Sequence, residues 1–438
     1  MFTWSSDDGA PSTLTHQRHG VRLHASRVGG MGEREANMAT MTTGYDVDAV
    51  RAQLPALKEL TYLNTGTEGI LAEPVLEAYL AAVAAHDRYG HVGIAHATAE
   101  SEAGRKRFAA LLHASPDEIA WSHNATDGVN LFLQSIAWPM DGLGEVIISN
   151  EEHPAIIMPW YTLAARGGPR VRMFAVSPDA DETLANFRTV LSGRTVAIAV
   201  SHVSCETGIR LPIAELCRLA KERGAWAFVD GAQSVAQFDF SPRAIGADAL
   251  TGNGHKWLCG PKGTGFLWVA SERLAELRPT FVGSGTYARE TLRDMFIDGA
   301  TPEMVHVDSA RRFEYGTRNF GPYAGLDAAL RYRDALGAAA IEAHQAAMSG
   351  LMKGSLAAIP GVTVHTPHAW EDSCGIVTFS LAGWVGTDLS HTLWDDHKII
   401  QRRVERPSGI RVSAAYFINT DDITRLCETV ERIGRETH

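Results

Sequence analysis

From about residue 45, short apolar runs of strand length alternate with stretches that have helical spacing, and this alternation restricts the fold more than any other feature. Strands separated by helices tend to pair in parallel, because each helix carries the chain back to the starting edge of the sheet. We therefore predict an α/β fold with a mostly parallel sheet. The clearest strand-like runs are Glu145–Ser149, Val196–Ser201, Ala225–Asp230, Asp248–Thr251 and Gly265–Ala270.

A length of 438 residues predicts more than one domain, because a single hydrophobic core rarely serves a chain of that size. After Gly321 a long helix, Tyr323 to about Ala347, precedes further short strands and a terminal helix, which predicts a separate α+β domain. Residues 1–40 lack the apolar core of a secretory signal and are expected to be a disordered leader. The expected divisions are 1–40 (leader), 41–65 (N-terminal segment), 66–320 (large domain) and 321–438 (small domain).

The composition excludes several classes of protein. The formal net charge is −11, which works against binding to nucleic acid, and no apolar run approaches the roughly 20 residues that span a bilayer. The five cysteines are scattered without a C-x-x-C pair, so they indicate neither a disulfide framework nor a metal site, and they fit a cytoplasmic location. A small-molecule partner is expected.

Asp230 ends one apolar strand, and Gln233 follows it three residues later. A carboxylate at this place can keep a pyridine nitrogen protonated, so that the ring withdraws electrons from a bound substrate. Gln233 is then expected to contact the phenolic oxygen of such a ring. The alternative is that Asp230 merely begins a turn.

Lys256 lies between glycines in the segment Thr251–Gly265. A lysine condenses with an aldehyde only as the free amine, which burial or a nearby cation supplies by lowering its pKa. We predict that Lys256 carries pyridoxal phosphate (PLP) as a Schiff base and that Asn253 and His255 hold the phosphate. A solvated surface lysine is the alternative, but the apolar residues after Lys256 weigh against it.

Two upstream segments supply further candidates. Ala125 and Thr126 open a helical stretch, where unpaired N–H groups favour a phosphate, although an ordinary helix cap has the same pattern. His153 follows the strand Glu145–Ser149 and is predicted to stack on the cofactor ring, although an isolated histidine is more often structural.

Taken in chain order, the segments around Thr126, His153, Asp230 and Lys256 resemble the class V aminotransferase family of fold-type I PLP enzymes. The resemblance covers roughly residues 60 to 436. The resemblance implies a large domain with a seven-stranded sheet and a smaller C-terminal domain. By the same resemblance Lys256 is the Schiff-base lysine, Asp230 the pyridinium partner and His153 the stacking residue. It also implies that Gln233 contacts the phenolate and that phosphate ligands lie at Thr126, Asn253 and His255.

Two more segments match the family. Phe313–Thr317 resembles its F-E-x-G-T element, which implies that Thr317 reaches the phosphate of a neighbouring subunit in a homodimer with shared active sites. Gly409–Ser413 resembles the substrate-carboxylate site, which makes Arg411 the anchor of an α-amino acid. A guanidinium suits this role, because its planar fork pairs with both carboxylate oxygens.

Two features of the sequence predict the reaction: a loop cysteine that is missing, and a cysteine where desulfurases have another residue. Cysteine desulfurases need a cysteine on a loop shortly before the position of Arg411, and residues 375–410 contain none, so this activity is disfavoured. Cys205 stands where desulfurases usually have asparagine, which points to the isopenicillin N epimerase-like branch, with its lincosamide-pathway relatives. We expect carbon–sulfur β-elimination, or decarboxylation with deamination, of an S-substituted cysteine in a biosynthetic pathway. An epimerase, an aminotransferase and a regulatory protein without catalysis are the alternatives.

Overall fold

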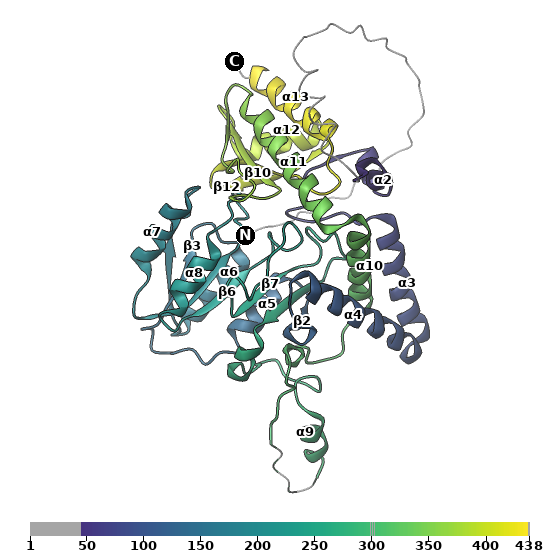
Figure 1. Ribbon diagram of the computed structural model, residues 1–438, viewed down its shortest axis with the longest axis vertical. Helices are drawn as coiled ribbons and strands as arrows, with labels where there is room; N and C mark the ends of the chain where they lie inside the picture. Colours follow the sequence, from purple (N-terminus) through teal and green to yellow (C-terminus); the bar gives the residue numbers. More distant parts are fainter. Residues whose placement is uncertain (1–44, 298, 300, 302, 437–438) are drawn as a thin grey trace, which may run out of the picture. The chain divides into compact units, whose positions relative to one another are not determined.

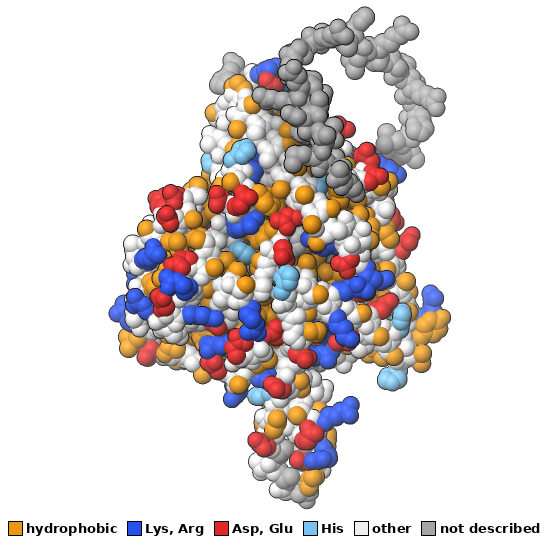
Figure 2. All heavy atoms as spheres, in the orientation of Figure 1, with side chains coloured by type: hydrophobic (Ala, Val, Ile, Leu, Met, Phe, Trp, Pro, Cys, Tyr) orange, Lys and Arg blue, Asp and Glu red, His pale blue; other side chains and the backbone are white. Residues whose placement is uncertain are grey.

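The computed structural model of the protein describes residues 45–297, 299, 301 and 303–436. These described residues all belong to one compact unit. The expected leader lies outside the described residues, and the boundary predicted at residue 320 stays a prediction. Within the described part of the chain, no helix is both long and apolar enough to cross a bilayer. On the face shown in Figure 2, basic and acidic side chains are interspersed.

A seven-stranded sheet in the order β2-β8-β7-β6-β5-β3-β4 forms the centre of this unit. Neighbours from β7 to β4 pair in parallel, whereas β8 pairs antiparallel with both β7 and β2. The predicted mostly parallel sheet is therefore confirmed. Its strands are β2 (Ile119–Ser122), β3 (Glu145–Ser149), β4 (Arg170–Phe174), β5 (Thr195–Ser201), β6 (Trp226–Asp230), β7 (Ala249–Asn253) and β8 (Gly265–Val269).

Helices cover both faces of this sheet, which is why its inner strands are apolar without alternation. Along β3, Ile147 packs in the core on one face, whereas Val146 and Ile148 pack in the core on the other. Figure 1 shows the helices around the sheet. They are α3 (Glu73–Tyr89), α4 (His91–Leu111), α5 (Ala125–Leu133), α6 (Pro154–Ala165), α7 (Ala180–Val190) and α8 (Ile213–Lys221).

The C-terminal part contains a second sheet, β12-β13-β10-β9, whose strands are all antiparallel, as expected for an α+β region. The long helix predicted from Tyr323 is two helices, because Gly337 adopts a φ of 86° and ends the first. The elements are α10 (Gly321–Leu336), α11 (Ala338–Ala357), β9 (Val362–Val364), β10 (Ile376–Leu381), α12 (Gly386–Asp395), β12 (Arg402–Glu405), β13 (Ser408–Ser413) and α13 (Thr420–Glu436).

Shorter elements connect these parts. Strands β1 (Thr61–Tyr62) and β11 (Ile399–Ile400) pair in parallel, which ties the N-terminal segment to the C-terminal part. Helix α9 (Arg289–Asp294) lies on the segment that projects at the bottom of Figure 1. The remaining elements are α2 (Val47–Ala52) and the 3₁₀ turns η1 (Pro55–Lys58), η2 (Pro116–Glu118), η3 (Ser271–Glu276) and η4 (Ala310–Phe313).

Candidate active site

The carboxyl ends of the parallel strands open onto a cavity of about 270 Å³. Ligands of open α/β sheets bind at this edge, because helix N-termini and loop side chains converge there. Seven of the nine predicted cofactor residues line the cavity, whereas Gln233 and Thr317 do not. The residues that line it are Thr67, Asn124, Ala125, Thr126, His153, Ala155, Asp230, Ala232, Asn253, His255, Lys256 and Arg402.

Lys256 and Asp230 form the electrostatic centre of this cavity. Burial lowers the pKa of the Lys256 amine to about 8, although the Asp230 carboxylate opposes that shift. Burial also raises the pKa of Asp230, whereas Lys256 and the Ala232 N–H, which donates to Asp230 Oδ1 over 2.8 Å, lower it. The chain therefore holds an amine that is partly neutral near pH 8 beside a carboxylate with one oxygen fixed.

Helix α5 points its N-terminus into the cavity from directly above the sheet. A Cβ at Gly128 would lie 2.1 Å from Thr251 Oγ1, and one at Gly265 would lie 2.5 Å from Asn124 Cα, so only glycine permits this approach. The Asn253 Oδ1 accepts a hydrogen bond from the Ala125 N–H over 3.0 Å, so these two groups satisfy each other. Thr126 remains at the cavity wall, where the helix dipole favours an anion.

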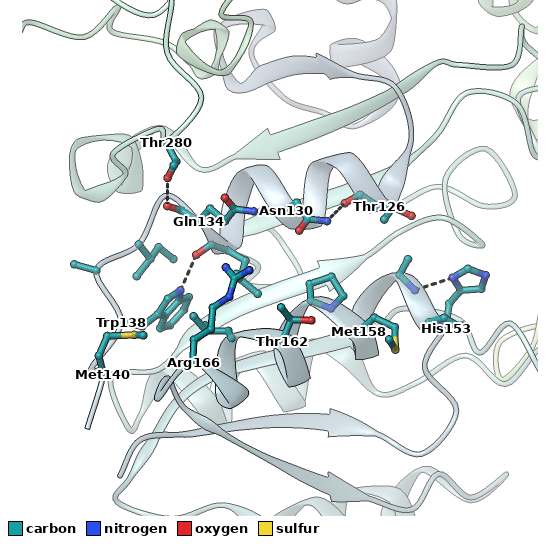
Figure 3. A pocket seen from close by; sticks show the side chains of 17 residues that line it. Thr126, Asn130, Gln134, Trp138, Met140, His153, Met158, Thr162, Arg166 and Thr280 are labelled. Carbon is teal, nitrogen blue, oxygen red and sulfur yellow. Dashed lines mark hydrogen bonds between the residues drawn. The ribbon is translucent and has the colours of Figure 1, made fainter. Parts of the chain in front are cut away.

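The two histidines of the cavity are both neutral at pH 7. Burial, with Lys256 nearby, lowers the pKa of His153 to about 3 and that of His255 to about 4. The His153 Nδ1 accepts a hydrogen bond from the Ala155 N–H over 3.1 Å, which fixes the ring at the start of α6 (Figure 3). The His255 Nδ1 is buried without a hydrogen-bond partner among the described residues, so it is available to a ligand.

Arg411 is buried completely on β13, just outside the cavity. Its Nη1 donates to the Cys205 carbonyl oxygen and its Nη2 to Thr67 Oγ1, each over 2.7 Å. Its Nε is buried without a partner among the described residues. Thr67, which does line the cavity, therefore lies between the predicted carboxylate anchor and the open space.

Two predicted cofactor residues lie elsewhere. The Gln233 Nε2 donates to the Gly66 carbonyl oxygen, and its Oε1 accepts from Trp257 Nε1, each over 2.8 Å, so both ends of the amide hold neighbouring loops. Thr317 is exposed and lines a separate pocket of about 190 Å³ with His123 and Asp127. Its predicted role toward a neighbouring subunit stays a prediction.

Thr67 and Arg402 both line the cavity, although no sequence pattern had singled them out. Arg402 on β12 pairs with Arg411 on β13, and the two strands are joined through Arg406 and Pro407 alone. The pattern of two arginines nine residues apart around a proline-containing turn was the available signal. A single strand pattern does not show which residues face each other across a hairpin.

A larger cavity of about 930 Å³ adjoins the first and shares Thr126, His153 and Ala155 with it. Figure 3 shows Thr126 and His153 at one end of this cavity and Trp138, Met140 and Arg166 at the other. Helices α5 and α6 supply most of its wall. The cavity at the sheet edge therefore continues toward a wider, mainly apolar opening.

A family model described as aminotransferase class-V matches residues 70–426. The chain belongs to the class V aminotransferase family. The resemblance and the fold-type I architecture predicted from the sequence are confirmed, and the cofactor is pyridoxal 5′-phosphate. The donors described above fit this group: an amine for its aldehyde, a buried carboxylate for its ring, and a helix N-terminus with an unpartnered imidazole nitrogen for its phosphate.

Relatives and solved structures give a finer comparison. A cysteine desulfurase of Escherichia coli O127:H6 is 32% identical over 414 residues, which are 89% of this chain and 99% of that protein. A probable cysteine desulfurase 2 of Mycobacterium leprae is 31% identical over 431 residues, covering 91% of this chain and all of that protein (100%). A complex of the cystine C–S lyase C-DES with its reaction product cysteine persulfide is 27% identical, with a TM-score of 0.77, and covers 86% of this chain and 99% of that one.

These relatives correct the predicted reaction. A cysteine desulfurase was disfavoured, and this was wrong, because the relatives over nearly the whole chain are named cysteine desulfurases. The preferred reaction on an S-substituted cysteine in a biosynthetic pathway is overturned with it. The prediction depended on a missing loop cysteine and on Cys205 in place of an asparagine, two local differences that do not outweigh similarity over nearly the whole chain. The epimerase and aminotransferase alternatives gain no support from these relatives.

Proposed function

We propose that the protein is a PLP-dependent carbon–sulfur lyase that removes the sulfur atom of cysteine, as the cysteine desulfurases it resembles are named for doing. The observation that supports this most directly is the amine of Lys256 beside Asp230 in a cavity flanked by two arginines. The similarity to named desulfurases at 31–32% identity supports cysteine as the proposed substrate.

The side chains of the cavity have different proposed roles. When bound, PLP supplies an aldehyde for the substrate amine and a ring that withdraws electrons from the α-carbon. Lys256 Nζ, with a pKa of about 8, is suited to take the α-proton near neutral pH. Asp230 is suited to keep the ring nitrogen protonated, and the fixed His153 ring offers a flat surface for stacking.

Arg411 is proposed to bind the substrate carboxylate. Its cationic state is secure, since burial lowers its pKa only to about 10. The two hydrogen bonds to Cys205 and Thr67 hold the guanidinium in one orientation. A substrate carboxylate would replace the Thr67 hydroxyl at Nη2, because a charge-assisted pair is stronger than a neutral one.

A homodimer with shared active sites is part of this proposal. Thr317 is exposed and outside its own cavity, as expected if it completes the site of a second copy. The projecting segment around α9 also leaves Phe296 86% exposed and Ile297 56% exposed, which is unfavourable in water. Sedimentation velocity of the loaded enzyme would test this; a monomer at micromolar concentration would contradict it.

The assay for the main proposal uses the purified enzyme loaded with PLP. Cysteine is supplied with a reducing thiol, and alanine and released sulfide are quantified, with cystine as a parallel sulfur donor. We expect alanine and sulfide in equal amounts from cysteine. Formation of a keto acid by amino-group exchange, or recovery of both cysteine enantiomers without sulfide, would contradict the proposal.

A further inference from the structure

All five cysteines of the chain lie within the described residues, so each can be judged as an acceptor of sulfur. A cysteine attacks as its thiolate, which requires access and a pKa that is not raised. Four of the five are buried, at 3% exposure or less, and the fifth lies on the C-terminal helix α13. Burial raises the thiol pKa in every case, to about 12 for Cys205, Cys217, Cys259 and Cys427, and above the usual value for Cys374.

Of the five cysteines, Cys205 has the best position to accept sulfur, but its surroundings do not favour the thiolate. Its carbonyl oxygen accepts from Arg411, but its side chain does not line the cavity. Burial is the main cause that raises the pKa of its thiol; the Glu206 carboxylate, 3.9 Å from Sγ, acts in the same direction, and the cations Arg411, Lys256 and Arg402 only partly oppose it. The side chain that desulfurases use for sulfur therefore has no equivalent here.

The hairpin between β12 and β13 also excludes a mobile loop that would carry an acceptor thiol. The pairing runs from Arg402 with Arg411 to Glu405 with Ser408, so only Arg406 and Pro407 connect the strands. A two-residue turn has no room for a loop that could carry a thiol back into the cavity. Sulfur taken from cysteine must therefore pass to a molecule that enters from outside.

Arg402 indicates the chemical class of this external sulfur acceptor. Its side chain is half-buried on the cavity wall, and no hydrogen bond or ion pair engages its guanidinium within the described part of the chain. Its cross-strand neighbour Arg411 has two partners already and is assigned to the substrate carboxylate. A second, unengaged guanidinium favours a second anion, and a carboxylate matches its fork.

We infer that the sulfur acceptor is a diffusible thiol that carries a carboxylate, and that Arg402 binds this carboxylate; the inference rests on the proposed desulfurase function. In the step, the acceptor thiol loses its proton and its sulfur forms an S–S bond with the sulfur of the substrate. The Cβ–S bond breaks, and its electron pair stays on the β-carbon, which takes a proton. The products are alanine and the persulfide of the acceptor, so atoms and electrons balance.

The test compares two thiols that differ by a carboxylate, 3-mercaptopropionate and 2-mercaptoethanol, as acceptors for the loaded enzyme with cysteine. We expect the ratio of their kcat/KM values to fall at least about tenfold in Arg402→Gln, because a charge-assisted contact is lost for one thiol only. Arg402→Lys should restore part of the ratio. Arg403→Gln is the matched control, since Arg403 is exposed on the same strand and pairs with Glu405.

The outcomes separate this inference from the proposed function. An unchanged ratio in Arg402→Gln overturns the inference, as does a persulfide found by mass spectrometry on a cysteine of the enzyme after one turnover without added thiol. Loss of turnover in Cys205→Ala, with the bound cofactor retained, would overturn it in the same way. Absence of alanine with every thiol would instead contradict the desulfurase function itself.

Discussion

The edge of the seven-stranded sheet and the β12–β13 hairpin both approach the same cavity, but they are built in different ways. The sheet edge holds its polar groups by short local bonds, such as the Ala232 N–H to Asp230 and the Ala155 N–H to His153. The hairpin supplies two arginines from paired positions, one locked by two hydrogen bonds and one without a partner among the described residues. We therefore propose that the sheet edge determines the cofactor chemistry, whereas the hairpin determines which carboxylates bind.

Lys256→Ala gives the largest effect that this comparison predicts. Removing the amine should reduce sulfur release at least about 10³-fold, because both the covalent attachment and the base are lost. Borohydride reduction followed by peptide mass spectrometry should find PLP on position 256 only in the parent enzyme. Lys262→Ala is the control, since Lys262 donates to the Gly69 carbonyl oxygen and should leave the attachment intact.

Asp230→Asn should lower kcat about 10²-fold, since a neutral amide no longer holds a proton on the ring nitrogen. Asp248→Asn is a matched control, because Asp248 is equally buried and accepts from the Ala227 N–H at the opposite end of the strands. The control should reduce thermal stability with little change in kcat. Equal losses of kcat in both variants would show that a carboxylate at the carboxyl ends of the strands has no special role.

The rate at which PLP reloads the apoenzyme should depend on pH through Lys256. Only the neutral amine condenses with an aldehyde, so with a pKa near 8 the rate should fall roughly 50-fold from pH 8 to pH 6. Asp230→Asn should move this profile to lower pH, because the Asp230 carboxylate raises the pKa of Lys256. Stopped-flow absorbance of the bound cofactor measures both, and a flat profile would contradict the assignment.

Arg411→Lys should produce the smallest of these effects and only on the hairpin side. We expect KM for cysteine to rise about tenfold, because a lysine cannot form the two-pronged pair with a carboxylate. The absorbance of the bound cofactor should stay unchanged, since Arg411 lies outside the cavity. A loss of cofactor together with the change in KM would mean that the two regions are not separable.

The sheet edge was largely predictable from the sequence, because each element there is local. The strand Glu145–Ser149 was predicted with its observed bounds, Asp230 ends an apolar strand, and Lys256 follows another at the expected edge. Arg402 and Thr67 were not predictable in the same way. Their positions depend on the pairing of β12 with β13 and on a contact between Thr67 and Arg411, which are 344 residues apart.

Gln233 shows what local spacing does not reveal. Its spacing from Asp230 suggested a cofactor contact, which stays a prediction; the structure adds that its amide bonds with Gly66 and Trp257, and Gly66 lies 167 residues away in the chain. The split of the predicted long helix at Gly337 has a different cause, a positive φ that an Ala-rich pattern does not reveal. The direction of the polypeptide at such points is set by backbone conformation, which the apolar periodicity does not encode.

Helix α5 and the sheet below it touch so closely at Gly128 and Gly265 that no methyl group fits between them. Translation of α5 by even a fraction of a side-chain radius would therefore require the strands beneath it to move as well. An anion that binds at its first turn would thus meet a helix end held in place by close contacts with both β7 and β8. Substitutions among the residues that line the cavity could therefore change the reaction without moving the position at which an anion would bind.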